Sequence, residues 1–498
     1  MYGYYKPLRN HLRGFNLWSG LGAVYSYMQF LQWQKPLPPE LLNAPLASGQ
    51  SAMRAGLHGH LVELLARELL LNAEMRGGKP FNHAAHAFGA MRMIHQLDDT
   101  YWGLHETRSS DIMFQLSRIA FKQFPYQKPI TNGALSRYHL LYGHPLIAPL
   151  VESEFGLTST ELFQVLLLLL QELYQNPMPP FAFLQGADAK ARNSMVALLD
   201  RLSKPAKTMR ADLIERQTYG VNWAFSFNPL REHPLIHAGN PQSMMCPLPV
   251  ALAQRLSDGL YFDLIRADDS FGDRVGAAFE DYVGEVAGRI GTGWLEMLGE
   301  ERWGKPERRS VDWIMQDHTA ALFVECKLAR LDIASQTELA DEPPLTDAIG
   351  KLARYVGQVY ATLADALDGR YPHWKPDGRP IHPIIVTFHE WFCFGPFFYA
   401  HLDKLVDETF TARGLERELL DRYPFSICSV GDFEGLLEAC RSEGIDPVLN
   451  LAKSPSHRQS ILGGFLVERY PGCLSAAHDV LQDGLDTILE GPSRLTGR

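Results

Sequence analysis

The sequence predicts a mixed α/β (α+β) protein of more than one domain, in which a mostly helical first half precedes a four-stranded mixed β-sheet flanked by helices. Apolar residues recur with helical spacing at 57–73 and 158–175. Residues 321–328 have the period of a strand, and short apolar runs of strand length occupy 382–389 and 425–430. At 498 residues the chain is long for one domain, and its 46% hydrophobic content is enough for sizeable cores.

The predicted protein divides into four segments along the chain. We expect an α-helical accessory domain over 1–215 and a β-rich bridge over 216–260. The sheet domain is expected over 261–460, with an insertion at about 391–423. Residues 461–498 are expected to form a C-terminal helical tail.

Several local signals support these segments. Thr158 and Glu161 have the spacing of a capping box at the start of a helix. In the bridge, three apolar runs broken by Pro, Gly and Asn predict short strands at 224–229, 234–238 and 243–249. In the tail, one helix is expected over 474–489.

Cysteine use and hydropathy predict a cytoplasmic protein without a membrane anchor. Six cysteines are scattered without a CxxC pair, which favours a reducing compartment over a disulfide framework or a structural zinc site. Residues 14–34 hold no charged residue and follow Arg9 and Arg13, as in a signal or anchor sequence. The same stretch holds Asn, Ser, Gln and Gly residues, so we favour a buried helix rich in aromatic residues.

The most informative stretch is Ser310-Val-Asp312-Trp-Ile, followed ten residues later by Leu322-Phe-Val-Glu325-Cys-Lys327. We expect 310–315 and 321–328 to form a hairpin of two adjacent strands. Strand alternation then places Glu325 and Lys327 on one face, roughly 6–7 Å apart. Because Asp312 is expected in the neighbouring strand, the hairpin brings two carboxylates and one lysine together.

The acid-x-Lys triplet has little weight without its surroundings. In a chain of this composition it arises by chance about once or twice, and it occurs at Asp188-Ala-Lys190 and at Glu325-Cys-Lys327. The first copy lies in a polar stretch without a strand pattern, so we interpret it as incidental. The second lies in a nearly apolar strand, where charged residues need a compensating reason. A surface salt-bridge cluster that includes Asp312 is the alternative interpretation.

A helix expected at 275–290 adds a third acid, because Glu280 lies beside its apolar stripe. The order of helix acid, strand Asp, strand Glu-x-Lys and a further helix resembles the PD-(D/E)xK nuclease superfamily over residues 260–460. Val311 stands where that superfamily often has a proline. The resemblance implies a restriction-endonuclease-like domain whose catalytic residues are Glu280, Asp312, Glu325 and Lys327.

The resemblance also implies a cofactor and a mechanism. Asp312 and Glu325, with Glu280 completing the set, would bind Mg²⁺ through oxygen ligands, and Mn²⁺ would substitute for it. Lys327 would orient or deprotonate the attacking water and offset charge in the transition state. In-line attack would leave 5′-phosphate and 3′-hydroxyl ends.

The helix expected after this motif, at 349–367, is a candidate for substrate contact. Its candidate residues lie on one face, where some families of the superfamily have Gln-x-x-x-Tyr; an ordinary solvated face is the alternative. They are Lys351, Tyr355 and Gln358. The aromatic run at 391–399 is expected to pack against the helical half, with base stacking as the alternative.

Charge divides the chain unevenly. Residues 1–250 hold 22 Lys+Arg against 17 Asp+Glu, and the remainder holds 25 against 40, so the half with the sheet is acidic. A basic segment at 190–216 in the first half is a candidate nucleic-acid surface. Three acids interrupt that segment and a fourth, Asp188, lies just before it, so a merely solvated helical region is equally consistent. The candidate contacts there are Lys204, Lys207 and Arg210.

These patterns predict a metal-dependent DNA endonuclease, the nuclease component of a prokaryotic defence, restriction or mobile-element system. No P-loop is present in the sequence, so a separate partner protein such as an ATPase is expected, and the chain is a candidate homo-oligomer. Two alternatives remain open. One is a non-catalytic nucleic-acid-binding or scaffold subunit that retains the nuclease fold, and the other is an RNase with the same metal chemistry.

Overall fold

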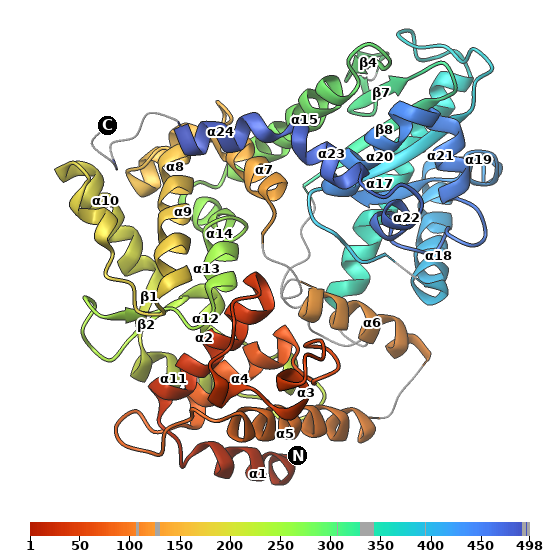
Figure 1. Ribbon diagram of the computed structural model, residues 1–498. Helices are drawn as coiled ribbons and strands as arrows, with labels where there is room; N and C mark the ends of the chain where they lie inside the picture. Colours follow the sequence, from red (N-terminus) through yellow and green to blue (C-terminus); the bar gives the residue numbers. More distant parts are fainter. Residues whose placement is uncertain are drawn as a thin grey trace.

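The computed structural model describes residues 1–105, 109–124, 130–305, 307–328, 343–393, 395–490 and 495 of the chain. Over these residues the protein is mixed α/β and mostly helical, with small mixed sheets (Figure 1). The predicted fold class is confirmed at that level. No single helix in this part of the chain has the length and apolarity to cross a membrane, whereas the bent pair α8 (Ala148–Phe155) and α9 (Ser159–Gln175) would suffice by length and composition alone.

The first helices share a hydrophobic core of their own. The uncharged stretch at 14–34 forms α2 (Leu17–Trp33), and Leu21, Val24 and Met28 are fully buried in that core, as predicted. Asn16 begins the helix by accepting a hydrogen bond from the N–H of Ser19 at 3.0 Å. The other helices of this core are α1 (Tyr2–Leu12), α3 (Ala44–Ala47), α4 (Gly59–Asn72), α5 (Ala84–Gly103) and α11 (Ala206–Arg216).

Helices α7 to α10 form a second group. Capping residues in the sequence explain where two of these helices, α9 and α10, begin. Thr158 and Glu161 form the predicted capping box at the start of α9. Asp188 begins α10 by accepting a hydrogen bond from the N–H of Ala191 at 2.8 Å. The triplet Asp188-Ala-Lys190 is therefore a helix cap and first turn. Within this group, α7 spans Asn132–Gly143 and α10 spans Ala189–Leu202. The preceding helix in the chain is α6 (Ser109–Gln123).

Replacing Asp188 by alanine is expected to lower the free energy of unfolding by about 1 kcal/mol, because the N–H of Ala191 loses its acceptor. Urea denaturation measures the change. Asp188→Asn retains a capping oxygen and is expected to keep most of the stability. An equal loss in both variants would contradict the capping role.

The bridge at 216–260 holds only two short strands. β2 (Leu235–His237) and β3 (Met244–Met245) match the second and third predicted strands, and β2 also pairs in parallel with β1 (Ser203–Pro205). The rest of the segment consists of turns and short helices, so the bridge is less β-rich than expected. Its main helices are α13 (Pro249–Arg255) and α14 (Leu260–Ala267).

The strand predicted at 224–229 is wrong. The segment forms a 3₁₀ turn, η4 (Trp223–Phe225), and leads into the short helix α12 (Pro229–Glu232). The Asn228 side chain caps α12 by accepting a backbone hydrogen bond at 3.1 Å, and the proline at the first helical position has a fixed φ that suits a helix. The Asn-Pro pair thus starts a helix where the apolar residues alone suggested a strand.

A five-stranded mixed sheet lies at the centre of the C-terminal half, one strand more than predicted. The strand order is β10-β9-β8-β7-β4. β7 and β8 form the expected antiparallel hairpin, whereas β8, β9 and β10 run parallel. The additional strand, β4, pairs with β7 at the sheet edge, where its side chains are exposed or half-buried. Its two apolar residues, Met297 and Leu298, are adjacent, so no period-two alternation marks it in the sequence. The strands are β4 (Glu296–Gly299), β7 (Trp313–Gln316), β8 (Ala321–Lys327), β9 (Ile381–Thr387) and β10 (Ser426–Ser429).

Helices cover both faces of this sheet (Figure 1). Leu322 and Val324 of β8 pack into a core shared with α15 and α20, whereas Ala321 and Phe323 pack into a separate core with α17 and α18. The predicted alternation of β8 is therefore confirmed. The helices are α15 (Phe271–Ile290), α17 (Pro343–Leu367), α18 (Pro396–Arg413) and α20 (Val430–Glu443).

The core on the α15 side continues beyond the predicted sheet domain. Leu166 of α9 and Leu198 of α10 belong to the same buried cluster as Val324 of β8. An ion pair of 2.7 Å between Arg137 of α7 and Glu434 of α20 joins the same two regions. The hydrophobic core thus crosses the predicted boundary at residue 215.

The insertion and the tail are both helical. Trp391 and Phe398 are buried in the core beside α17. The Phe392 ring contacts Phe121 of α6 and Phe124 just after that helix, at 4.8 and 5.0 Å between centroids. The aromatic run is therefore used in packing, partly against the helical half as expected. The tail helix predicted at 474–489 is divided into α23 (Cys473–Val480) and α24 (Gln482–Glu490). The other helices here are α19 (Glu418–Arg422), α21 (Ile445–Ala452) and α22 (Leu462–Arg469).

Candidate active site

The end of β8 presents Glu325 and Lys327 on one face of the sheet. Residues of the same parity, Ala321 and Phe323, pack against α17, so alternation directs the two charged side chains to that side. Lys327 Nζ forms an ion pair with Oε1 of Glu325, whose side chain is 0% exposed. The ring of Tyr355 on α17 lies 5.7 Å from the same ammonium. The structure thus brings one candidate substrate contact, Tyr355, to Lys327, the candidate catalytic lysine.

Asp312 lies immediately before β7 and not within a strand, which corrects the expected position. β7 begins at Trp313, and the Asp312 carboxylate accepts a hydrogen bond from the N–H of Cys326 at 2.6 Å. The Asp312 side chain thus supplies the N–H of Cys326 with the hydrogen-bond acceptor that the backbone of a longer β7 would otherwise supply. The short strand thereby holds a carboxylate beside the charged end of β8.

Glu280 reaches the same place from α15, as the sequence predicted. The indole N–H of Trp313 donates to the backbone carbonyl of Glu280 at 3.0 Å, which joins α15 to the start of β7. Gly284, one turn further along, lets the indole lie against the helix, because a Cβ there would be 2.0 Å from the ring. Two strands and one helix therefore place Glu280, Asp312, Glu325 and Lys327 together.

The electrostatics show that the three acids interact. Burial, then the charge of Asp312, raises the pKa of Glu325 to about 8, and the same two causes raise the pKa of Glu280 to about 7. Burial also raises the pKa of Asp312, although the charge of Lys327 opposes it. For Lys327, burial lowers the pKa, but the charges of Glu325 and Asp312 outweigh burial and raise it.

Glu300 is a fourth acid near this cluster that the sequence did not indicate. It follows β4, and its charge contributes to the raised pKa values of both Glu280 and Asp312. Its carboxylate also lies 3.6 Å from the guanidinium of Arg309. The sequence of β4 shows no period-two alternation. Only the pairing of β4 with β7 therefore reveals that Glu300 lies near Glu280 and Asp312.

The cluster offers an incomplete set of metal ligands. Across the described residues, no group of three or more His, Cys, Asp or Glu side chains is placed to hold a metal ion, so Glu280, Asp312 and Glu325 do not form a three-ligand cage. Mg²⁺ nevertheless commonly takes one or two carboxylates, with waters and substrate phosphate oxygens as its other ligands. Oε2 of Glu325 is buried and has no hydrogen-bond partner among the described residues. The donor set therefore fits Mg²⁺ held mainly by Asp312 and Glu325.

The other candidate substrate contacts on α17 flank Tyr355. Lys351 is exposed one turn before it, and Gln358 is half-buried one turn after it. The structure shows no contact of Gln358 or Lys351 with the acidic cluster in the part of the chain that it describes. They remain candidates by position along the helix.

Two of the three candidate contacts in the first half are engaged within the protein. Lys204 pairs with Asp212 at 2.7 Å. Arg210 donates to the backbone carbonyls of Leu70 and Ala73 at 2.8 and 2.5 Å, and so stabilises the end of α4. Lys207 is exposed. For Lys204 and Arg210, the structure favours the alternative of a solvated helical region.

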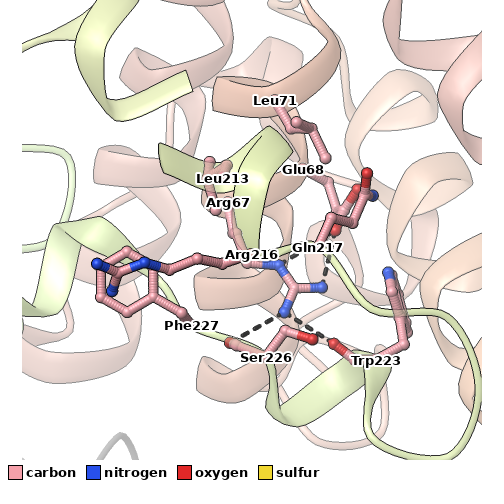
Figure 2. Close-up of a pocket in the computed structure, with 9 residues that line it drawn as sticks. All are labelled: Arg67, Glu68, Leu71, Leu213, Arg216, Gln217, Trp223, Ser226 and Phe227. Atoms are coloured by element: carbon pink, nitrogen blue, oxygen red, sulfur yellow. Dashed lines mark hydrogen bonds and ion pairs between the residues drawn. The ribbon is translucent and has the colours of Figure 1, made fainter. Parts of the chain in front are cut away.

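A separate pocket opens in the first half, away from the acidic cluster. Its cavity volume is only about 10 Å³, and Figure 2 shows Arg216 extended across Phe227 on one side and the Trp223 indole on the other. The charged groups at its centre are already paired. Arg67 donates to the carbonyls of Trp223 and Ser226 and to the Glu68 carboxylate (Figure 2). These contacts favour a structural role, joining α4 to the bridge.

In EDTA, Glu325→Gln is expected to stabilise the protein more at pH 9 than at pH 5. Because the folded-state pKa of Glu325 is raised from 4.5 to about 8, its favourable contribution is fully present below pH 4.5 and is lost as the pH rises through 8. Glutamine resembles the protonated side chain and avoids that loss, by about 1–3 kcal/mol at pH 9. Melting temperatures of both proteins measure the difference. An equal effect at both pH values would contradict the raised pKa.

Comparisons of the chain with protein-family models, curated proteins and solved structures found no match. The functional inference therefore rests on the residues of the cluster: three converging acids, a lysine paired with one of them, and an aromatic ring beside that lysine.

Proposed function

We propose that the chain is a metal-dependent endonuclease, a phosphodiester hydrolase of DNA whose sheet domain is restriction-endonuclease-like. The observation that supports this most is the buried Glu325 carboxylate, which has one oxygen paired with Lys327 and the other without a partner in the described residues. Buried carboxylates are ordinarily fully paired, so this oxygen is a donor that a cation could use.

The balance of charge also favours a cation site over a salt-bridge cluster. One ammonium, that of Lys327, faces the three acids Glu280, Asp312 and Glu325, and the pKa of each of these carboxyls is raised. A cluster that served stability alone would be expected to hold its carboxylates at ordinary or lowered pKa values. A divalent cation would supply the missing positive charge.

In the proposed reaction, Asp312 and Glu325 hold Mg²⁺ and Glu280 completes the acidic face. When bound, the cation acidifies water and offsets charge on a phosphoryl oxygen. Lys327 donates hydrogen bonds to the attacking water and to the phosphoryl group as negative charge develops. Tyr355 lies beside Lys327, with its ring centroid 5.7 Å from the ammonium.

The acidic half of the chain does not attract nucleic acid by its overall charge. We therefore include in the proposal a partner protein, such as an ATPase, or a second copy of this chain, which delivers the substrate within a prokaryotic defence, restriction or mobile-element system. All six cysteines are free, which supports a reducing compartment such as the cytoplasm.

The proposal is tested by incubating the full chain with supercoiled plasmid, single-stranded DNA and RNA, in Mg²⁺, Mn²⁺ or EDTA. The expected result is nicking of DNA in Mg²⁺ or Mn²⁺ and none in EDTA. Binding of Mg²⁺ by titration calorimetry, with the wild-type chain and Asp312→Asn, gives a second measurement that does not depend on the substrate.

The outcomes separate the alternatives. Cleavage of RNA alone would replace the DNA substrate by RNA and leave the metal chemistry in place. Binding of nucleic acid without cleavage or Mg²⁺ binding, under all these conditions, would favour the scaffold subunit and contradict the endonuclease.

A further inference from the structure

A second set of polar side chains lies at the opposite end of β9 from the acidic cluster. Lys453, which follows α21, forms a hydrogen bond of 2.9 Å between its Nζ and Nδ1 of His382. Nε2 of the same imidazole lies 3.0 Å from Oδ1 of Asp446. His382 and Thr387, the partner of Lys327 in the sheet, are five residues apart along β9, or roughly 17 Å. The two sets are therefore spatially separate.

The protein holds this relay of amine, imidazole and carboxylate in a fixed position. His382 is the second residue of β9, where its side chain is 4% exposed. Asp446 lies in the first turn of α21, and its N–H donates to the Thr319 hydroxyl at 3.0 Å. Gly444, with φ of +90°, lets the chain approach the same threonine, because a Cβ there would be 2.6 Å from the Thr319 methyl group. Strand, turn and helix are thus fitted closely together.

The protonation states suit a nucleophile and its base. Burial lowers the pKa of Lys453 to about 7, although the charge of Asp446 opposes it. Burial and the charge of Lys453 lower the pKa of His382 to about 4, so the imidazole is neutral and can accept a proton at Nδ1. Nε2 then carries the hydrogen that is donated to Asp446. An amine beside a base that a carboxylate orients is the arrangement of a nucleophilic site.

We propose that Lys453 is a reactive amine that accepts acyl groups from thioesters, with His382 as its base and Asp446 holding the imidazole. The uncharged amine attacks the thioester carbonyl carbon, and an N–C bond forms while the carbonyl opens. The amine then becomes strongly acidic and transfers its proton to Nδ1 of His382. As the carbonyl re-forms, the C–S bond breaks and the proton passes to the departing sulfur. The products are an amide on Lys453 and a free thiol.

Thioesters fit this relay because a thiolate is a good leaving group that needs little help from an acid, and because the reaction needs neither a metal nor a redox partner. Lys453 as a whole residue is half-buried, and its hydrogen bond to His382 is part-buried, so the amine is buried enough to have a lowered pKa and the acyl donor has to be small. Acylation would remove the positive charge of Lys453 and its hydrogen bond to β9.

The test uses the full chain with S-acetyl-N-acetylcysteamine, a small acetyl thioester, at pH 7.5. Acetylation is followed at each lysine by digestion and mass spectrometry. Lys453 is expected to react at least tenfold faster than the exposed Lys351. Its rate is expected to level off above pH about 7 in the folded chain. In urea, the same residue should follow an ordinary lysine, with a midpoint near ~10.4.

Two variants test whether His382 acts as a base for Lys453 or only lies near it. His382→Gln is expected to slow acetylation of Lys453 at least tenfold, and Asp446→Asn less, while Lys351 reacts as before. Melting curves verify that each variant folds; if either does not, the pH profile of the wild-type chain decides. Lys453 reacting no faster than Lys351, or the same profile in urea and buffer, would overturn the proposal. Because the readout is the mass of a peptide, it is independent of nuclease activity.

Discussion

Replacing Lys327 by alanine is expected to abolish the proposed Mg²⁺-dependent cleavage, with a loss of at least ~10³-fold in rate. The ammonium forms an ion pair with Glu325 and lies beside Tyr355, where a water and a phosphoryl group would meet it. Its removal takes away the ammonium that, among the described residues, opposes the charges of Glu280, Asp312 and Glu325. The rate of plasmid nicking, with the substrate that cleaves best, measures the effect.

Loss of the buried ion pair can also destabilise the fold, so Asp312→Asn provides a gentler variant. Asparagine retains an oxygen for the N–H of Cys326 and removes only the charge, so the fold is expected to be kept and cleavage lost. The matched control is Lys190→Ala, in the other acid-x-Lys triplet, which is expected to cleave like the wild-type chain. Undiminished cleavage in both Lys327→Ala and Asp312→Asn would remove the cluster from the mechanism.

Replacing Glu434 by alanine is expected to lower the free energy of unfolding by about 3–5 kcal/mol. Both carboxylate oxygens of Glu434 accept hydrogen bonds from Arg137, at 3.0 and 2.7 Å, and Tyr282 donates to one of them at 2.7 Å. These residues come from α20, α7 and α15, and the Glu434 side chain is 1% exposed. Alanine would leave a buried guanidinium without its counter-ion. Urea denaturation measures the loss.

Two controls locate the origin of that loss. Tyr282→Phe removes one hydroxyl only and is expected to cost about 1 kcal/mol. Glu285→Ala breaks an exposed pair with Arg289 on α15 and is expected to cost at most ~0.5 kcal/mol. If Glu434→Ala cost no more than Glu285→Ala, the buried pair would not be what joins the helical half to the sheet.

Much of the candidate site could be predicted because its pattern is local. The period-two alternation of 321–328 placed Glu325 and Lys327 on one face, and the structure confirms that face against α17. The apolar stripe of α15 likewise placed Glu280 at its border. Both predictions depend on residues close in sequence, whose relative directions follow from strand and helix geometry.

The errors arose where long-range pairing or a cap competes with local preference. β4 has no period-two alternation and is a strand because it pairs with the edge that β7 offers. Asp312 lies outside β7 because its side chain takes the N–H of Cys326. The strand expected at 224–229 became a turn and a helix because Asn228 caps the helix that begins at the following proline.

The sequence by itself determined which residues share a strand face or a helix stripe, and so which charged side chains lie beside one another in β8. Only the tertiary structure decided that Glu300 comes near Asp312, and that Lys453, His382 and Asp446 form a relay. The reason is physical. Local geometry repeats with a known period, whereas contacts between distant segments depend on how buried faces pack, and no local period encodes that packing.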